Sequence, residues 1–209
     1  MMSTYVKFCG IRTPSELNCA VAVGVDAIGL VLAPESVRTL SLQDAAALRN
    51  AAPLSLDIFL LVRNADAEFI RTALHLINPG IIQFHGNESV EFCRQFERPY
   101  CKALSFNEPD LHGQIRAYDD AEWIILDGHA PGAAGGSGIV GDWQIFSEYL
   151  GERGMLAGGL HAGNVADALR VSRATAVDVS SGIESEPGVK SPGRMAAFMQ
   201  AVRSAHQEH

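Results

Sequence analysis

Short apolar runs alternate along the chain with longer stretches that carry helix signals, and this alternation constrains the fold more than any other feature. The runs are rich in valine, isoleucine and leucine, and they span residues 5–9, 27–32, 56–62, 81–84, 100–104, 123–126, 155–157 and 176–179. Strands that are apolar throughout are buried on both faces, and repeated strand–helix alternation favours a parallel sheet with right-handed crossovers. The pattern therefore predicts an α/β protein.

The stretches between these runs begin with residues that typically start helices. Thr13 can cap a helix whose first turn holds Pro14, and Glu16 completes a capping box. Ser41 and Asn64 are the predicted N-caps of two further helices.

The number of strand–helix units and the length of 209 residues fit a closed (β/α)8 barrel near its lower size limit. An open doubly wound sheet satisfies the same alternation, so the pattern alone does not establish closure. No linker, low-complexity segment or repeat period marks a second domain. We predict a single-domain (β/α)8 TIM barrel over residues 1–209.

The composition argues against several classes of protein. With 47% hydrophobic and 19% charged residues, and no apolar run of about 18 residues, the chain is typical of a globular protein without a membrane span. The N-terminus lacks a secretory pattern, so we expect a cytoplasmic protein. The net charge of −8 argues against a nucleic-acid partner, although a local basic cluster could hold a small anion. The four cysteines form no C-x-x-C pair, which predicts free thiols and no zinc site.

Polar residues interrupt the apolar runs at strand ends, where reacting groups collect in parallel α/β proteins. Cys9 ends the first run, His85 follows the fourth, Asp127 follows the sixth, and Asp178 lies in the eighth. Each has an ordinary structural interpretation as well. A buried cysteine often acts as a small hydrophobe, a histidine can be a satisfied core residue, and an aspartate can cap the next helix or turn.

Glycine clusters suggest a phosphate site, because glycine lets backbone N–H groups approach an anion closely. The clusters lie in residues 135–138, 157–159 and 180–182, and tight turns are the alternative explanation. Two of them follow the seventh and eighth runs, where (β/α)8 barrels commonly bind phosphate. Residues 136–141 also match G-x-G-x-x-G, but the preceding strand ends too far upstream for a dinucleotide-binding turn.

The opening Val6-Lys7-Phe8-Cys9-Gly10-Ile11 resembles the V-K-I-C-G-I of phosphoribosylanthranilate isomerases, enzymes of tryptophan biosynthesis. The resemblance continues in order over nearly the whole chain. The further matching segments are Ser36-Val37-Arg38, Gln83-Phe84-His85-Gly86, Leu126-Asp127, Gly135-Gly136-Ser137-Gly138, Asp142-Trp143, Ala157-Gly158-Gly159-Leu160, Asn164-Val165, and Val177 to Glu184 followed by Pro187-Gly188-Val189-Lys190. Departures occur at Ile139, where many members carry lysine, at Gly141, where an aromatic is usual, and at residues 61–64, where Leu-Val-Arg-Asn replaces a V-F-V-N-like strand end.

The resemblance implies a cofactor-free and metal-free Amadori rearrangement of N-(5-phosphoribosyl)anthranilate to the carboxyphenylamino-deoxyribulose phosphate. Asp127 would be the general acid that opens the furanose ring, and Cys9 the general base that removes the C2 proton. Near neutral pH the acid Asp127 must hold a proton and the base Cys9 must lose one, but their unperturbed pKa values of about 3.9 and 8.5 favour the opposite states. We therefore expect burial to raise the pKa of Asp127 and cationic neighbours to lower the pKa of Cys9.

The resemblance also implies the groups that hold the substrate. Arg38 would bind the anthranilate carboxylate through its bidentate guanidinium. His85 would orient either substrate hydroxyls or Cys9, and Asp178 would contact the ribose chain. The implied phosphate-binding residues are Gly136, Gly138, Gly158, Gly159, Ser180, Ser181 and Gly182.

Two other functions compete with this interpretation. The first is a related phosphosugar isomerase of histidine biosynthesis, which uses paired aspartates, one of them at the end of the first strand where this chain has Cys9. The second is a non-catalytic protein that binds a phosphoribosyl ligand, although the presence of Cys9, Arg38 and Asp127 together argues against it. The expected partner is a small phosphoribosyl substrate, and the sequence allows either a monomer or a homodimer.

Overall fold

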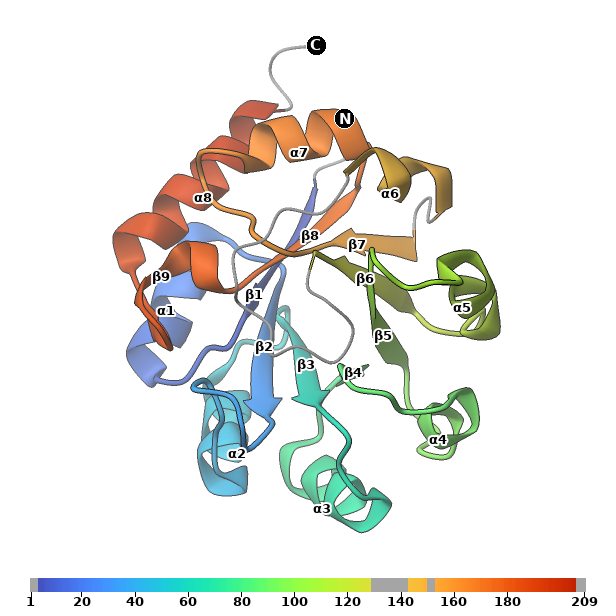
Figure 1. Ribbon diagram of the computed structural model, residues 1–209. Coiled ribbons are helices and arrows are strands. Elements are labelled where there is room, and N and C mark those ends of the chain that lie inside the picture. The colour runs from blue at the N-terminus through green and yellow to red at the C-terminus, as the bar shows by residue number, and fades with distance from the viewer. Residues whose placement is uncertain (1–3, 129–142, 150–152, 206–209) are drawn as a thin grey trace.

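The strands close into a parallel barrel surrounded by helices, as Figure 1 shows for the computed structural model, which describes residues 4–128, 143–149 and 153–205. The barrel strands are β1 (Tyr5–Cys9), β2 (Ala27–Leu32), β3 (Asp57–Val62), β4 (Ile81–Phe84), β5 (Tyr100–Ser105), β6 (Trp123–Asp127), β7 (Gly154–Leu156) and β8 (Ala176–Val179). The helices are α1 (Pro14–Val23), α2 (Leu42–Ala51), α3 (Ala67–Ile77), α4 (Val90–Arg94), α5 (Leu111–Ala117), α6 (Trp143–Tyr149), α7 (Val165–Ser172) and α8 (Pro192–Ala205). The predicted (β/α)8 barrel is confirmed, and the predicted strand bounds agree with these within one residue.

Closure comes from the pairing of the first and last strands. β1 pairs in parallel with β8, with Tyr5 opposite Ala176 and Phe8 opposite Val179. Each remaining strand pairs with its neighbours in chain order. The open doubly wound sheet is therefore excluded.

The helix starts follow from local capping. Thr13 and Glu16 form the predicted capping box of α1, and the Ser41 side chain accepts a hydrogen bond at the start of α2. The prediction for Asn64 was wrong, because Asp66 caps α3. Asn64 instead adopts a left-handed conformation with φ of 49°, and its side chain accepts a hydrogen bond from the backbone N–H of Asn87 at 2.8 Å.

Alternate residues of each strand serve two separate apolar layers, and this explains why the runs are apolar throughout. Ile58 and Leu60 of β3 belong to the large cluster between the barrel and the helices, whereas Phe59 packs inside the barrel with Ile125 of β6 and Met155 of β7. Burial of each such side chain contributes about 1.5–3 kcal/mol of stability. The inward-facing series of each strand ends at the barrel mouth, where polar residues replace apolar ones.

A short addition follows β8 and completes one side of this mouth. The 3-10 helix η2 (Ser181–Ile183) leads into an antiparallel hairpin of β9 (Glu184–Glu186) and β10 (Val189–Lys190). The hairpin brings Glu184 and Lys190 back beside β1 and β8, where both are buried. In the described part of the chain, no helix is long and apolar enough to cross a membrane.

Candidate active site

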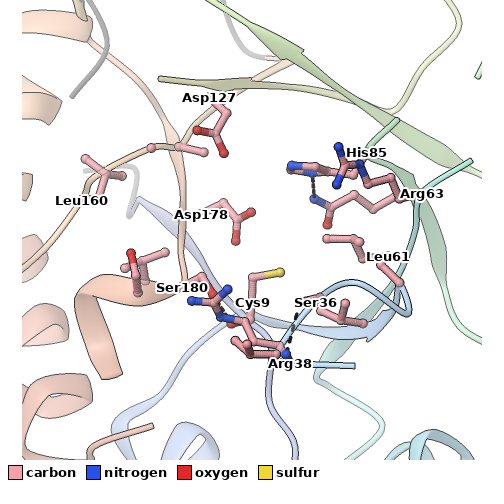
Figure 2. Close-up of a pocket in the computed structure, with 18 of the residues that line it drawn as sticks. Cys9, Ser36, Arg38, Leu61, Arg63, His85, Asp127, Leu160, Asp178 and Ser180 are labelled. Atoms are coloured by element: carbon pink, nitrogen blue, oxygen red, sulfur yellow. Dashed lines mark hydrogen bonds between the residues drawn. The ribbon is translucent and has the colours of Figure 1, made fainter. Parts of the chain in front are cut away.

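A pocket lies at the carboxyl ends of the strands and gathers most of the predicted site residues (Figure 2). Cys9 and Arg38 line it from the ends of β1 and the segment after β2, His85 from β4, Asp127 from β6, and Asp178 from β8. Gly158, Gly159, Ser180 and Ser181 complete the wall after β7 and β8. Gly182 borders an adjoining hollow, and Gly136 and Gly138 lie outside the described residues.

Cys9 occupies the inner face of β1 and is 6% exposed. The neighbouring position on β2 is Gly29, where a Cβ atom would lie 2.8 Å from the Cys9 Sγ and 3.3 Å from the Lys7 Nζ. Glycine therefore leaves the space that the thiol and the ammonium group occupy. Burial raises the pKa of the Cys9 thiol, and the opposing effects of Lys7 and Lys190 do not reverse this. The expectation that cationic neighbours lower this pKa was wrong for the unliganded site, because desolvation is the larger effect.

Asp178 forms a buried ion pair with Lys7 inside the barrel, with a distance of 2.9 Å between Nζ and Oδ1. Burial acts to lower the pKa of Lys7, but Asp178 and Cys9 outweigh it and the net direction is upward. Lys7 therefore stays an ammonium ion beside Cys9. The sequence analysis assigned no role to Lys7, although a lysine at an inward-facing position of an apolar strand is itself a signal.

His85 lies at the end of β4 and is oriented by the buried Gln83 two residues before it. The Gln83 Nε2 contacts the His85 Nδ1 at 3.3 Å, and this contact is drawn in Figure 2. With the Gln83 amide in this orientation its nitrogen donates and Nδ1 accepts, which leaves the proton of a neutral ring on Nε2. His85 can therefore present an N–H donor to a ligand. Gln83 is a second residue that the sequence analysis passed over.

Arg38 is held by Glu184 in a bidentate ion pair. Its Nε and Nη2 donate to the two carboxylate oxygens at 2.6 and 2.8 Å. Glu184 also pairs with Lys190 at 2.7 Å, and the Lys190 ammonium donates to the Ser180 backbone and hydroxyl oxygens. Burial acts to raise the pKa of Glu184, but the bonds from Arg38 and Lys190 outweigh it and the net direction is downward. The Nη1 edge of Arg38 makes no hydrogen bond to another described residue, so that edge is the one available for a ligand.

Asp127 lies across the mouth from Cys9, with Asp178 between them in the view of Figure 2. Gly158 packs against the strand end that carries Asp127. Its φ is +86°, and a Cβ there would lie 2.3 Å from the Gly128 nitrogen and 2.8 Å from the Asp127 Oδ1. Only glycine fits this conformation and this close approach. The β7 loop is thus shaped around the carboxyl group of Asp127.

Backbone N–H groups are available at the β7 and β8 ends of the pocket. Those of Gly159, Ser181 and Gly182 make no hydrogen bond to the described residues, and the latter two open η2. Gly182 has a packing role as well, because a Cβ there would lie 1.8 Å from the Leu160 carbonyl oxygen. The Ser180 hydroxyl donates to the Cys9 carbonyl oxygen at 3.0 Å, so it ties the two loops together. Such clustered N–H groups are suited to an anion.

Comparison with known proteins agrees with this geometry. A family model described as N-(5'-phosphoribosyl)anthranilate (PRA) isomerase matches residues 6–201. N-(5'-phosphoribosyl)anthranilate isomerase of Stenotrophomonas maltophilia is 40% identical over 205 residues, which cover 97% of this chain and 94% of that protein. The crystal structure of phosphoribosyl anthranilate isomerase from Thermotoga maritima matches with a TM-score of 0.86 and 30% identity, covering 96% of this chain and 99% of that one. A structure of such an isomerase in complex with reduced 1-(o-carboxyphenylamino)-1-deoxyribulose 5-phosphate matches with a TM-score of 0.84 and 29% identity, over 96% and 99% of the two chains.

Proposed function

This chain belongs to the N-(5'-phosphoribosyl)anthranilate isomerase family and is an isomerase of tryptophan biosynthesis, and we propose that Cys9 and Asp127 carry its Amadori rearrangement as general base and general acid. It converts N-(5'-phosphoribosyl)anthranilate to 1-(o-carboxyphenylamino)-1-deoxyribulose 5-phosphate. The observation that carries the proposal is the placement of these two side chains on opposite sides of one pocket, at the ends of β1 and β6.

The first step would be anchoring of the substrate phosphate. The backbone N–H groups of Gly159, Ser181 and Gly182, which line one hollow, would form the anion site, and Gly158 and Ser180 shape the loops that carry them. Gly136 and Gly138 stay predicted members of this site. A phosphate held after β7 and β8 extends the ribose over the centre of the mouth, between Cys9 and Asp127.

The second step is acid catalysis by Asp127. The carboxyl proton would pass to the furanose ring oxygen, the C1–O bond would break, and the nitrogen lone pair would form the C1=N bond of a Schiff base. His85 would donate from Nε2 to a substrate oxygen, and Asp178 would contact the ribose chain while Lys7 holds it.

The third step is proton abstraction by Cys9. The thiolate would take the C2 proton, and the electron pair would move into a C1=C2 bond as the Schiff-base nitrogen becomes neutral. The resulting enolamine then gives the C2 ketone by tautomerisation. Lys7 and Lys190 supply the positive charge that stabilises the thiolate once it forms. The reaction requires no cofactor in this scheme.

Single-turnover kinetics with freshly generated substrate tests the proposal, because decay of its fluorescence reports conversion. Cys9→Ser and Asp127→Asn should each lose about two to four orders of magnitude in rate and keep their affinity for a product analogue. Cys19→Ser, on α1 outside the pocket, is the matched control and should turn over like the wild type. Wild-type rates in either site variant would remove that residue from the mechanism.

The wider assignments rest on the sequence. We propose that residues 1–209 form one catalytic domain, that the protein is cytoplasmic, and that it has neither a nucleic-acid nor a membrane partner. The family includes a dimeric enzyme, since a third solved structure is described as monomers generated from dimeric phosphoribosylanthranilate isomerase of Thermotoga maritima. For this chain, both the monomer and the homodimer remain predictions.

A further inference from the structure

Arg63 is a cation inside the pocket at a position where the sequence departs from the family pattern. It follows β3 and continues the inward-facing series of Phe59 and Leu61. Its side chain is 15% exposed and lines the pocket together with Arg38 and His85. A largely buried guanidinium in a ligand pocket is suited to contact an anionic group of the ligand.

The position of Arg63 in the barrel places it at the end of the pocket far from the anchored phosphate. In a closed ring of eight strands in chain order, β3 is diametrically opposite β7. Figure 2 shows this separation, with Leu160 and Ser180 on one side and Arg63 and His85 on the other. A substrate anchored by phosphate after β7 and β8 therefore directs its aromatic end toward β2, β3 and β4.

The bonds of the two arginines differ in a way that makes Arg63 suited to a ligand. Arg38 has its Nε and Nη2 edge tied to Glu184, which is 4% exposed. Arg63 is paired through Nη1 with Glu35 at 3.0 Å, and the Glu35 side chain is 47% exposed. An ion pair with so exposed a partner contributes little, so a ligand carboxylate can exchange with Glu35 or share the guanidinium with it.

We propose that Arg63 is a second guanidinium for the aryl carboxylate of the substrate, acting with the remaining edge of Arg38 and making this chain selective for carboxylated aryl ligands. The inference rests on the proposed function, because that function supplies a substrate with phosphate and carboxylate at opposite ends. A planar guanidinium matches a carboxylate through parallel hydrogen bonds, which a lysine cannot reproduce. Arg63 would thus determine specificity without taking part in proton transfer.

The test compares two ligands that differ only in the carboxylate. The first is reduced 1-(o-carboxyphenylamino)-1-deoxyribulose 5-phosphate, and the second is its counterpart made with aniline in place of anthranilate. Dissociation constants are measured by calorimetry for the wild type, Arg63→Gln, Arg63→Lys and the control Arg49→Gln. Arg49 is a half-buried arginine on α2 outside the pocket, and its loss changes the net charge equally.

Arg63→Gln should weaken binding of the carboxylated ligand by about tenfold to hundredfold, the range for one hydrogen bond between charged groups. It should change the affinity for the aniline ligand less than about twofold. The affinity of Arg63→Lys for the carboxylated ligand should lie between those of Arg63→Gln and the wild type. The dissociation constants of Arg49→Gln for both ligands should equal those of the wild type.

Equal losses for both ligands, or no loss for either, would overturn the inference. Binding of the aniline ligand also shows that the variant is folded. Turnover of phosphoribosylanthranilate by the wild type keeps the two proposals distinguishable. If the wild type turns over this substrate but the variants lose no selectivity, only the role of Arg63 fails. If the wild type does not turn it over, the proposed function fails and the inference falls with it.

Discussion

Replacing Lys102 with methionine should destabilise the barrel by about 3–5 kcal/mol, although Lys102 is not part of the pocket. Lys102 lies on the outward-facing side of β5, and its Nζ is 3.0 Å from the Glu88 Oε2, with both side chains at most 4% exposed. The ammonium group also donates to the Gly86 carbonyl oxygen. Methionine leaves the carboxylate buried without its cation, although backbone N–H groups of Asn64 and Gly86 still reach it at 2.7 and 2.8 Å. These two bonds stabilise the remaining charge and keep the loss within that range.

The loss should appear as a melting temperature lowered by roughly 6–20 °C, at about 2–4 °C for each kcal/mol in a domain of this size. Urea unfolding followed by circular dichroism measures the free energy directly. Arg94→Met is the matched control, because Arg94 pairs with Asp119 and Asp120 at the surface, where solvent screening should leave the free energy of unfolding nearly unchanged. A Lys102→Met protein whose free energy of unfolding lies within about 1 kcal/mol of the wild-type value would refute the reasoning. A Lys102→Met/Glu88→Gln double variant also removes the buried carboxylate charge, so it should recover part of the lost stability. Recovery of none of it would refute the reasoning as well.

Two further predictions follow from pKa directions. Because burial raises the pKa of Cys9, alkylation of Cys9 by iodoacetamide in the unliganded protein should be slow at pH 7 and still accelerate above about pH 9. The rate is measured as the difference between the wild type and Cys9→Ser, and a rate that levels off near pH 9 or below would contradict the raised pKa. The lowered pKa of Glu184 contributes stability above the unfolded-state value of about 4.3, and this stability is lost as pH falls through the folded-state value. In urea titrations, Glu184→Gln should therefore be less stable than the wild type by about 3–5 kcal/mol at pH 7. Between pH 7 and pH 3 the variant should lose less stability than the wild type does. Parallel profiles of the free energy of unfolding against pH for the two proteins would count against this prediction.

The barrel could be predicted from sequence because both faces of every strand pack against apolar neighbours. That requirement produces the continuous runs, and the capping box of Thr13 and Glu16 marks a helix start without any tertiary information. Asn64 was misassigned as a cap because a residue type suited to capping is equally suited to a left-handed turn. Its true role depends on Asn87, in the next loop along the barrel, which periodicity cannot reveal.

The candidate site was only partly predictable for a related reason. Cys9, His85 and Asp127 stand out because each is a polar residue at the end of an apolar run. The partners that set their chemistry do not follow such a rule. Lys7 and Gln83 lie within the runs themselves, and Glu184 reaches Arg38 across 146 positions of sequence. Contacts of that range depend on the closed barrel and on the β9–β10 hairpin, so they require the structure.

The charges of the pocket explain how a protein with a net charge of −8 can hold a substrate with two anionic groups, a phosphate and a carboxylate. Arg38 and Arg63 line the mouth, and the buried Lys7 and Lys190 lie beneath it. Three carboxylates pair with these four cations, namely Asp178, Glu35 and Glu184. These cations lie on the β1, β2, β3 and hairpin side of the mouth, where low solvent exposure limits screening, whereas a fourth carboxylate, Asp127, lies across the mouth at the end of β6. Glu35 is the most exposed of the three carboxylates and the one that a ligand can most easily displace. Displacement would turn the positive charge of Arg63 toward the ligand carboxylate at the aromatic end, while in the proposed binding mode the backbone N–H groups would hold the phosphate at the other end. The arrangement thus favours a ligand with two separated anionic groups over one with a phosphate alone.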